Sequence, residues 1–338
     1  MIEIYTRIIE DSTIGERLGY GLNNSNKERE FIYTYACEKG ERSLCEMEMQ
    51  FLFGIKPDAP ILKSKFEIEP SRSPFFRERI EVMFDGESVS DIVTQVQQLP
   101  LLESTFKVIF VKTNDLKKSE KIRHGERKSI EREIGWHIKG EADLMEAEIV
   151  FGIVPFKGRW YFGKYRKSEP VWLRHQKKPR EYSTALNTRV ARAVANIAVP
   201  NPNGIKAIDP CCGIGTVLVE ALSMGIDIVG RDINYLAADG ARENIAYFNL
   251  EGDVKAGPIS AVTSSYDVAI IDLPYNLYTS ITPEEQAAII QQTRRIADKA
   301  VIITIEPIDQ VIEEAGFEIE ARCEAHKGYF SRQILVCG

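Results

Sequence analysis

Strand-like and helix-like segments alternate with short connections from residue 184 to the end of the chain. This rhythm predicts an α/β fold, a doubly wound and mainly parallel sheet with helices on both faces. The last two strand segments follow each other closely, which predicts an antiparallel pair at the edge of the sheet. The strands are expected at 206–208, 227–230, 254–256, 267–272, 299–305, 317–325 and 333–337, and the helices at 184–197, 216–224, 235–248, 283–297 and 311–315.

The first half of the chain mixes strands and helices without a strict βαβ repeat, which is typical of an α+β region. The expected strands are 31–37, 65–69, 79–84, 106–111, 148–154 and 160–165, and the expected helices are 43–53, 88–99 and 119–138. A polar, basic stretch with two prolines separates the two halves. We therefore expect an N-terminal region at 1–172, a basic linker at 173–183 and a second domain at 184–338.

The chain's 338 residues suffice for two domains. It contains no apolar run long enough to cross a bilayer, and acids inside its first ten residues argue against a secretory signal. Its six cysteines form no CxxC pair, which argues against both a zinc site and a disulfide framework. These features predict a cytoplasmic protein that needs no metal and no membrane.

Charge is unevenly distributed along the chain, whose formal net charge is −7. Between residues 157 and 180, nine basic residues stand against a single acid, Glu169, and aromatic residues lie among them. Cations contact phosphates and rings stack on bases, so this stretch predicts an RNA contact, although a solvated surface would also explain it. The candidate RNA-binding residues are Lys164, Arg166, Lys167, Arg174, Lys177, Lys178 and Arg180.

A glycine-containing loop follows the first strand of the second domain. Its sequence DPCCGIGT begins with Asp209 and contains Gly213 and Gly215, which allow a tight turn close to a ligand. Asp232 ends the next strand, where a carboxylate accepts hydrogen bonds from ribose hydroxyls. A plain helix-entry turn would explain the loop alone. Further candidate cofactor contacts are Thr184, Cys211 and Ile233.

Two nucleoside cofactors compete for this loop. The dinucleotide fingerprint GxGxxG requires a third glycine, but Gly215 is followed by Thr216, Val217 and Leu218. An acid at the start of the loop is instead typical of S-adenosylmethionine enzymes, where its carboxylate meets the methionine ammonium. We therefore favour S-adenosylmethionine over NAD.

The sequence Asp272-Leu273-Pro274-Tyr275 follows the expected strand 267–272 and resembles the [DNS]PP[YF] signature of amino-group methyltransferases. An exocyclic amine on a base is a weak nucleophile because its lone pair is delocalised. The Asp272 carboxylate and the Leu273 carbonyl would accept its protons. Pro274 would stiffen the loop, and Tyr275 would stack on a flipped-out base.

These motifs, together with YSTALNTRVARAVANIA, VGRDIN and looser matches in the first half, resemble the THUMP-containing RNA methyltransferases of the tRNA guanosine N2-methyltransferase group. The resemblance covers most of the chain. It implies a ferredoxin-like and THUMP region that grips tRNA, followed by a Rossmann-like class I methyltransferase domain. It also implies methyl transfer from S-adenosylmethionine to guanine N2, at position 10 of tRNA in the best-known members.

The sequence departs from this family at three places. In the glycine loop, Cys211-Cys212 stand where an aromatic residue and Cys are commoner, and a small apolar pair can still pack there. Leu273 stands where the family usually has proline, although a backbone carbonyl survives that change. Gly257-Pro258 stands where an acid usually follows the third strand, so adenine would rely on backbone and apolar contacts such as Ile233. These departures leave two alternatives open: another amine target such as adenine N6 of RNA or DNA, or a protein glutamine, and an RNA-binding protein with an inactive domain. We expect tRNA as the partner and a monomer, with the need for an activating protein open.

Overall fold

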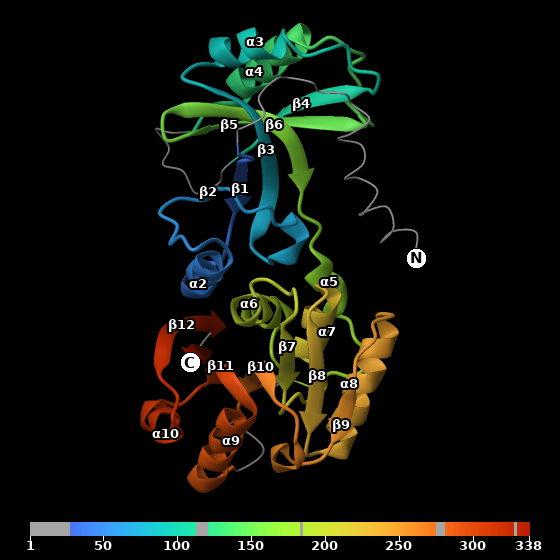
Figure 1. The fold of residues 1–338 in the computed structure, drawn as a ribbon. Coiled ribbons are helices and arrows are strands. Elements are labelled where there is room, and N and C mark those ends of the chain that lie inside the picture. Colours follow the sequence, from blue (N-terminus) through green and yellow to red (C-terminus); the bar gives the residue numbers. More distant parts are fainter. Residues whose placement is uncertain (1–27, 113–120, 183–184, 275–280, 328–329) are drawn as a thin grey trace.

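The computed structural model describes residues 28–112, 121–182, 185–274, 281–327 and 330–338. These residues form two stacked units, each built around its own β-sheet (Figure 1). Within the described residues, no helix is both long and apolar enough to cross a membrane.

The N-terminal unit has the α+β character that the sequence predicts. Its strands lie in the order β2-β1-β3-β6-β5-β4, and of these neighbours β4 and β5 pair in parallel. Helices α3 and α4 cover the far side of the sheet, where they share an apolar core with β4, β5 and β6 (Figure 1). The elements are β1 (Phe31–Tyr35), α2 (Arg42–Phe53), β2 (Ile61–Ser64), β3 (Phe76–Gly86), α3 (Val89–Val96), β4 (Phe106–Phe110), α4 (His124–His137), β5 (Ile149–Phe156) and β6 (Arg159–Lys167).

One expected strand of this unit is wrong. The sequence predicts a strand at 65–69, but the strand ends at Ser64. The Ser64 hydroxyl accepts a hydrogen bond from the Phe66 amide at 3.0 Å and turns the chain. The Tyr33 hydroxyl then donates to the Phe66 carbonyl at 2.8 Å and accepts from the Ile68 amide at 2.7 Å. Side-chain hydrogen bonds therefore replace the strand pairing that the alternating pattern suggests.

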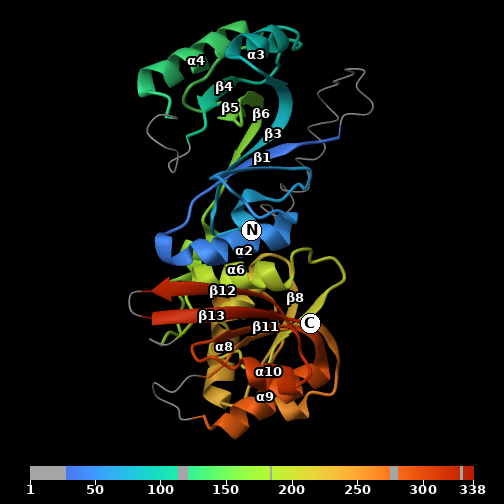
Figure 2. The same cartoon turned by 90° about the vertical axis from the view of Figure 1, so that its left-hand side faces the viewer.

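The C-terminal unit contains the predicted doubly wound sheet, in the order β12-β13-β11-β10-β7-β8-β9. Its edge strands β12 and β13 lie side by side in Figure 2. Strands β9, β8, β7, β10 and β11 are parallel, whereas β13 runs antiparallel to both β11 and β12. The antiparallel pair at the sheet edge is thus confirmed. The strands are β7 (Lys206–Asp209), β8 (Asp227–Asp232), β9 (Val254–Ala256), β10 (Tyr266–Asp272), β11 (Ala297–Thr304), β12 (Ile319–Lys327) and β13 (Phe330–Cys337).

Helices bury both faces of this sheet. Val268 and Ile270 of β10 belong to one apolar core with α6, α7 and α8, while Ala269 and Ile271 belong to another with α9 and α10. This alternation is what a continuous apolar strand predicts when both faces are covered. The helices are α5 (Val171–His175), α6 (Thr188–Ala198), α7 (Thr216–Ser223), α8 (Tyr235–Tyr247), α9 (Pro283–Ile296) and α10 (Asp309–Glu314).

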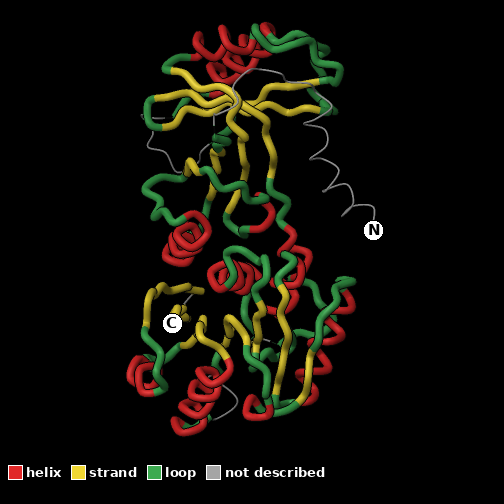
Figure 3. The backbone as a smooth tube through the Cα atoms, in the orientation of Figure 1, coloured by secondary structure: helices red, strands yellow, loops and turns green. Residues whose placement is uncertain are grey.

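The two units meet where α2 packs against α6 and β12, so that these two helices lie between the sheets (Figure 3). Glu48 of α2 is fully buried and accepts hydrogen bonds from Ser73 at 2.5 Å and from Asn196 of α6 at 2.7 Å. Arg192 of α6 donates to the carbonyls of Ser71 and Arg72, each at 2.8 Å. A buried polar network therefore joins the N-terminal unit to the C-terminal one.

Candidate active site

The site forms where the sheet changes its winding direction. Strand β7 has β8 on one side and β10 on the other, and ligands of doubly wound sheets bind outside the carboxyl ends of the strands at this switch point. Asp209 ends β7, Asp232 ends β8 and Asp272 ends β10. The carboxyl ends of β7 and β8 point away from the N-terminal unit (Figure 1).

The glycine loop between β7 and α7 is held by hydrogen bonds from its backbone amides to the carboxylates of Asp209 and Asp232. The Asp209 carboxylate accepts from the Cys211 amide at 3.2 Å, and the Asp232 carboxylate accepts from the Gly213 amide at 2.8 Å. The other Asp232 oxygen accepts from the Asn234 amide at 2.8 Å. Asp232 thereby connects two neighbouring βα turns, while further lone pairs on its oxygens remain for ribose hydroxyls.

Gly213 and Gly215 both adopt left-handed backbone, with φ of 51° and 77°. A Cβ on Gly215 would lie 3.0 Å from the Cβ of Ala241 on α8. A Cβ on Gly213 would lie 2.5 Å from the Tyr182 hydroxyl. Tyr182 therefore lies over the loop, a position that sequence reasoning missed because no motif marks it.

Asn244 of α8 ties the chain leading into the C-terminal unit to the loop. Its fully buried side-chain amide accepts from the Arg180 amide at 3.0 Å and donates to the carbonyls of Arg180 and Ile214, at 3.0 Å and 2.9 Å. The Arg180 side chain pairs with Glu243 at 2.6 Å. Sequence analysis missed Asn244 because a helical asparagine carries no motif of its own.

Asp272 carries the most unusual group of the site. Its Oδ1 atom is buried and has no hydrogen-bond partner within the described part of the chain. Burial raises the pKa of the Asp272 carboxyl to about 7, and the positive charge of Arg332 on β13 opposes that rise. Sequence analysis missed Arg332, which the antiparallel strand brings to the site from the end of the chain. A buried, unpartnered acceptor costs stability, which indicates a role in ligand binding or catalysis.

The three aspartates interact electrostatically. Burial raises the pKa of Asp209 well above its ordinary value, and the negative charges of Asp272 and Asp232 raise it further. Burial likewise raises the pKa of Asp232. The Asp209, Asp232 and Asp272 carboxylates are therefore close enough for the charges of the latter two to act on Asp209. A bound cation with an ammonium and a sulfonium group would relieve this repulsion, so the residues fit S-adenosylmethionine.

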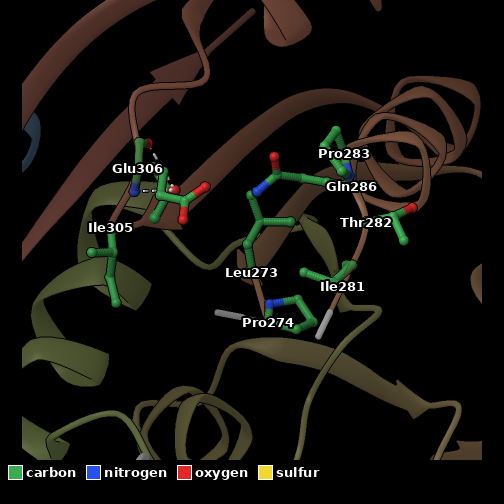
Figure 4. A pocket seen from close by; sticks show the side chains of 9 residues that line it. Leu273, Pro274, Ile281, Thr282, Pro283, Gln286, Ile305 and Glu306 are labelled. Atoms are coloured by element: carbon green, nitrogen blue, oxygen red, sulfur yellow. Dashed lines mark hydrogen bonds between the residues drawn. The ribbon is translucent and has the colours of Figure 1, made fainter. Parts of the chain in front are cut away.

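Leu273 and Pro274 continue from β10 into a pocket, shown in Figure 4. The Leu273 side chain is buried, and its amide donates to the Ile303 carbonyl of β11 at 3.0 Å. The pocket is lined by Leu273, Pro274, Ile281, Thr282, Pro283, Gln286, Thr304, Ile305 and Glu306.

The remaining candidate site residues lie at the loop, in the basic segment or outside the described residues. Cys211 lies in the glycine loop, where burial raises the pKa of its thiol, and Ile233 is exposed beside Asp232. Thr184 and Tyr275 lie outside the described residues. Because its pKa is raised, the Cys211 thiol is protonated and neutral at physiological pH.

The candidate RNA-binding residues spread over two elements and the segment after them. Lys164, Arg166 and Lys167 lie on β6, and Arg174 lies on α5. Several are already engaged: Arg166 pairs with Glu69 at 3.0 Å and Arg174 with Glu169 at 3.1 Å. Burial lowers the pKa of the Lys178 ammonium, whereas the Lys167 and Lys177 side chains are exposed. Their contact with RNA stays a prediction.

The strand order and the site together define a Rossmann-like class I methyltransferase domain. Comparison with known families agrees: residues 175–301 match the family model described as the RMKL-like methyltransferase domain. Residues 175–301 are therefore similar to a methyltransferase domain of that family. The matched description agrees with the methyltransferase domain that the sequence predicts.

Curated relatives extend the similarity. The tRNA (guanine(10)-N2)-dimethyltransferase of Methanothermobacter thermautotrophicus is 30% identical over 120 residues, which cover 33% of this chain and 34% of the relative. The enzyme of the same name from Pyrococcus abyssi is 24% identical over 58% of this chain and 61% of its own length. Each match spans less than two thirds of the relative. These similarities confirm the predicted resemblance to that group of methyltransferases.

Among solved structures, TrmN from Thermus thermophilus is similar with a TM-score of 0.46 and 15% identity. The match covers 91% of this chain and 99% of that one.

Proposed function

We propose that this protein transfers a methyl group from S-adenosylmethionine to the exocyclic N2 of a guanosine in RNA. The most specific form of this proposal is the guanosine at position 10 of tRNA. The names of the curated relatives support guanine N2 and tRNA. The six cysteines are all free, which fits the reducing cytoplasm where tRNA is modified.

The observation that carries this proposal is the buried Asp272 Oδ1 atom, which has no hydrogen-bond partner among the described residues. In the proposed reaction this oxygen and the Leu273 carbonyl accept hydrogen bonds from the two N–H groups of the target amine. They thereby hold the nitrogen lone pair toward the methyl donor. When bound, S-adenosylmethionine would supply the electrophilic methyl group, whose bond to sulfur breaks as the bond to N2 forms, leaving S-adenosylhomocysteine. As the new N–C bond forms, N2 loses a proton, which Asp272 accepts because burial has raised its pKa to about 7.

The cofactor is expected to bind across the ends of β7 and β8. Asp209 would face the methionine ammonium and Asp232 the ribose hydroxyls. Left-handed Gly213 and Gly215 would keep the loop free of side chains where the cofactor approaches. Ile233 is 77% exposed and would gain an apolar contact with adenine.

Adenine N6 is the second candidate target, because Leu273 replaces the first proline of the motif and Asp272 can accept protons from either amine. Unmodified bulk tRNA is incubated with labelled S-adenosylmethionine, and its nucleosides are then analysed by mass spectrometry. This experiment distinguishes guanine N2 from adenine N6 as the target. We expect N2-methylguanosine or its dimethyl form. Labelled N6-methyladenosine would contradict the guanine assignment, and absence of label despite S-adenosylmethionine binding by titration calorimetry would contradict the RNA substrate.

A further inference from the structure

The pocket beside Leu273 and Pro274 contains one acidic side chain that the proposed mechanism does not use. Strand β11 lies in register with β10, with Asp272 opposite Ile303, so the residues after β11 lie next to the catalytic segment. Glu306 follows there and lines the pocket. Its place after the neighbouring strand holds its backbone close to the position that the target base would occupy.

The turn that carries Glu306 is fixed by Thr304. The Thr304 side chain is buried, and its hydroxyl donates to the Glu306 carbonyl at 3.0 Å and accepts from the Glu306 amide at 3.2 Å. Both backbone groups of Glu306 are thereby bound, while its carboxylate reaches the pocket (Figure 4). This arrangement keeps an exposed acid beside an active-site loop.

Gln286 lies on the opposite side of the pocket, on the first turns of α9 (Figure 4). The helix start is held by a capping box in which Thr282 and Glu285 exchange hydrogen bonds. The Gln286 amide group is both a donor and an acceptor. The pocket therefore presents a pure acceptor, Glu306, and an amide that can donate, on two sides of the apolar Leu273 and Pro274.

This pattern matches the edge of guanine that carries the target amine. Next to N2, guanine presents the N1–H donor and then the O6 acceptor, whereas adenine presents an unprotonated N1 acceptor next to N6. A carboxylate binds an N–H and repels a lone pair. We propose that Glu306 is the specificity-determining residue that selects guanine by accepting its N1–H, with Gln286 donating to O6. This inference rests on the proposed guanine N2 methylation.

The test uses the full chain and a tRNA in which the methylated guanosine, once mapped, is replaced by 2-aminopurine. This base keeps the 2-amino group but has an N1 lone pair and no O6. Single-turnover methyl transfer to both tRNAs is measured for the wild type, Glu306→Gln and the control Glu313→Gln, which removes an exposed charge on α10 away from the pocket. Titration with S-adenosylmethionine and thermal unfolding accompany each variant.

We expect the wild type to prefer guanosine over 2-aminopurine by at least about 100-fold, because a site built for an N–H rejects analogues that lack it. Glu306→Gln should reduce that ratio at least tenfold, because the glutamine amide can donate to the N1 lone pair of 2-aminopurine. Cofactor affinity and melting temperature should stay unchanged, and Glu313→Gln should behave as the wild type.

Two failures are distinguishable. If the wild type methylates guanosine and Glu306→Gln leaves the ratio unchanged, the role of Glu306 is overturned and the proposed function stands. If the wild type methylates no guanosine, the proposed function is overturned and the selection of guanine by Glu306 with it.

Discussion

Two buried carboxylates mark the two functional regions of this protein, and they differ in whether their oxygens have partners. Glu220 of α7 lies beside the junction of the units, where one oxygen contacts His175 Nδ1 at 2.8 Å and the other accepts from Arg192 at 2.7 Å. Asp272 lies at the end of β10 with a buried Oδ1 that has no partner within the described residues. A satisfied buried charge fixes structure, whereas an unsatisfied one is available for a substrate.

The same contrast separates the basic residues. Arg180 is held by Glu243 and Arg174 by Glu169, so both are already paired at the surface. Lys177 is exposed, and Lys167 is exposed but lies opposite Glu78 of β3, on whose carboxylate its charge acts. If partnered groups maintain the fold and unpartnered ones bind ligands, substitutions in the two classes should affect different measurements.

The largest expected effect is on chemistry at Asp272. Asp272→Asn replaces one acceptor oxygen with a donor and removes the proton acceptor, so single-turnover methyl transfer should fall by about 10³-fold. The affinity for S-adenosylmethionine, measured by titration calorimetry, should change little because Asp209 and Asp232 remain. A single-turnover transfer rate within tenfold of the wild-type rate would contradict a catalytic role for the Asp272 carboxylate.

The next effect is on stability at the junction. Glu220→Ala leaves His175 and Arg192 buried without their acid, which should cost about 3–5 kcal/mol in the free energy of unfolding. Glu243→Ala is the matched control, because its pair with Arg180 is exposed and its loss should leave the free energy of unfolding nearly unchanged. Denaturant unfolding followed by circular dichroism measures both. Equal losses in the two variants would show that burial of the partners does not matter here.

The pH dependence sharpens the contrast. Because the pKa of Asp272 is raised to about 7, its carboxyl is protonated at lower pH and cannot accept the amine. The transfer rate should rise about tenfold per pH unit up to about pH 7 and level off above it. A raised pKa also means that stability is lost as pH rises through 7, so Asp272→Asn should be as stable as the wild type, or more stable, at pH 8. A flat rate profile between pH 5.5 and 8 would argue against an ionised Asp272 as the acceptor.

The smallest effect concerns RNA affinity. Lys177→Ala should weaken tRNA binding several-fold and lower the slope of log affinity against log salt by somewhat less than one unit. Lys167→Ala should lower the slope less than Lys177→Ala does, because Glu78 lies opposite Lys167. Arg180→Ala should change the slope less, because Glu243 already neutralises that guanidinium. Filter binding across a salt series measures the three slopes. If the three variants had equal slopes of log affinity against log salt, ion pairing within the protein would not decide which basic side chains contact RNA phosphates.

Much of the C-terminal unit is readable from the sequence because its signals are local. Apolar strands such as 267–272 and the helix starts after Gly215 and Asn234 depend on neighbouring residues, and the structure reproduces them within a few positions. The segment 65–69 misled the analysis because its alternation is overridden by the hydroxyls of Ser64 and Tyr33, one of which comes from a distant strand.

The site was predictable only where motifs mark it. Asp209, Asp232 and Asp272 end β7, β8 and β10, which are neighbours in the sheet, so the topology brings them together. Tyr182, Asn244 and Arg332 join the site through packing of segments far apart in the sequence, and no local pattern announces such contacts. Asp272 Oδ1 has no partner in the part of the chain that the structure describes, which is likewise a property of the assembled fold alone.

The most direct test of the central claim is a crystal structure of the protein with S-adenosylhomocysteine and its RNA substrate. We predict the guanine N2 within about 3.2 Å of both Asp272 Oδ1 and the Leu273 carbonyl oxygen, a hydrogen-bonding distance. A target base bound elsewhere, or an Asp272 Oδ1 paired with another protein group in the complex, would contradict the account.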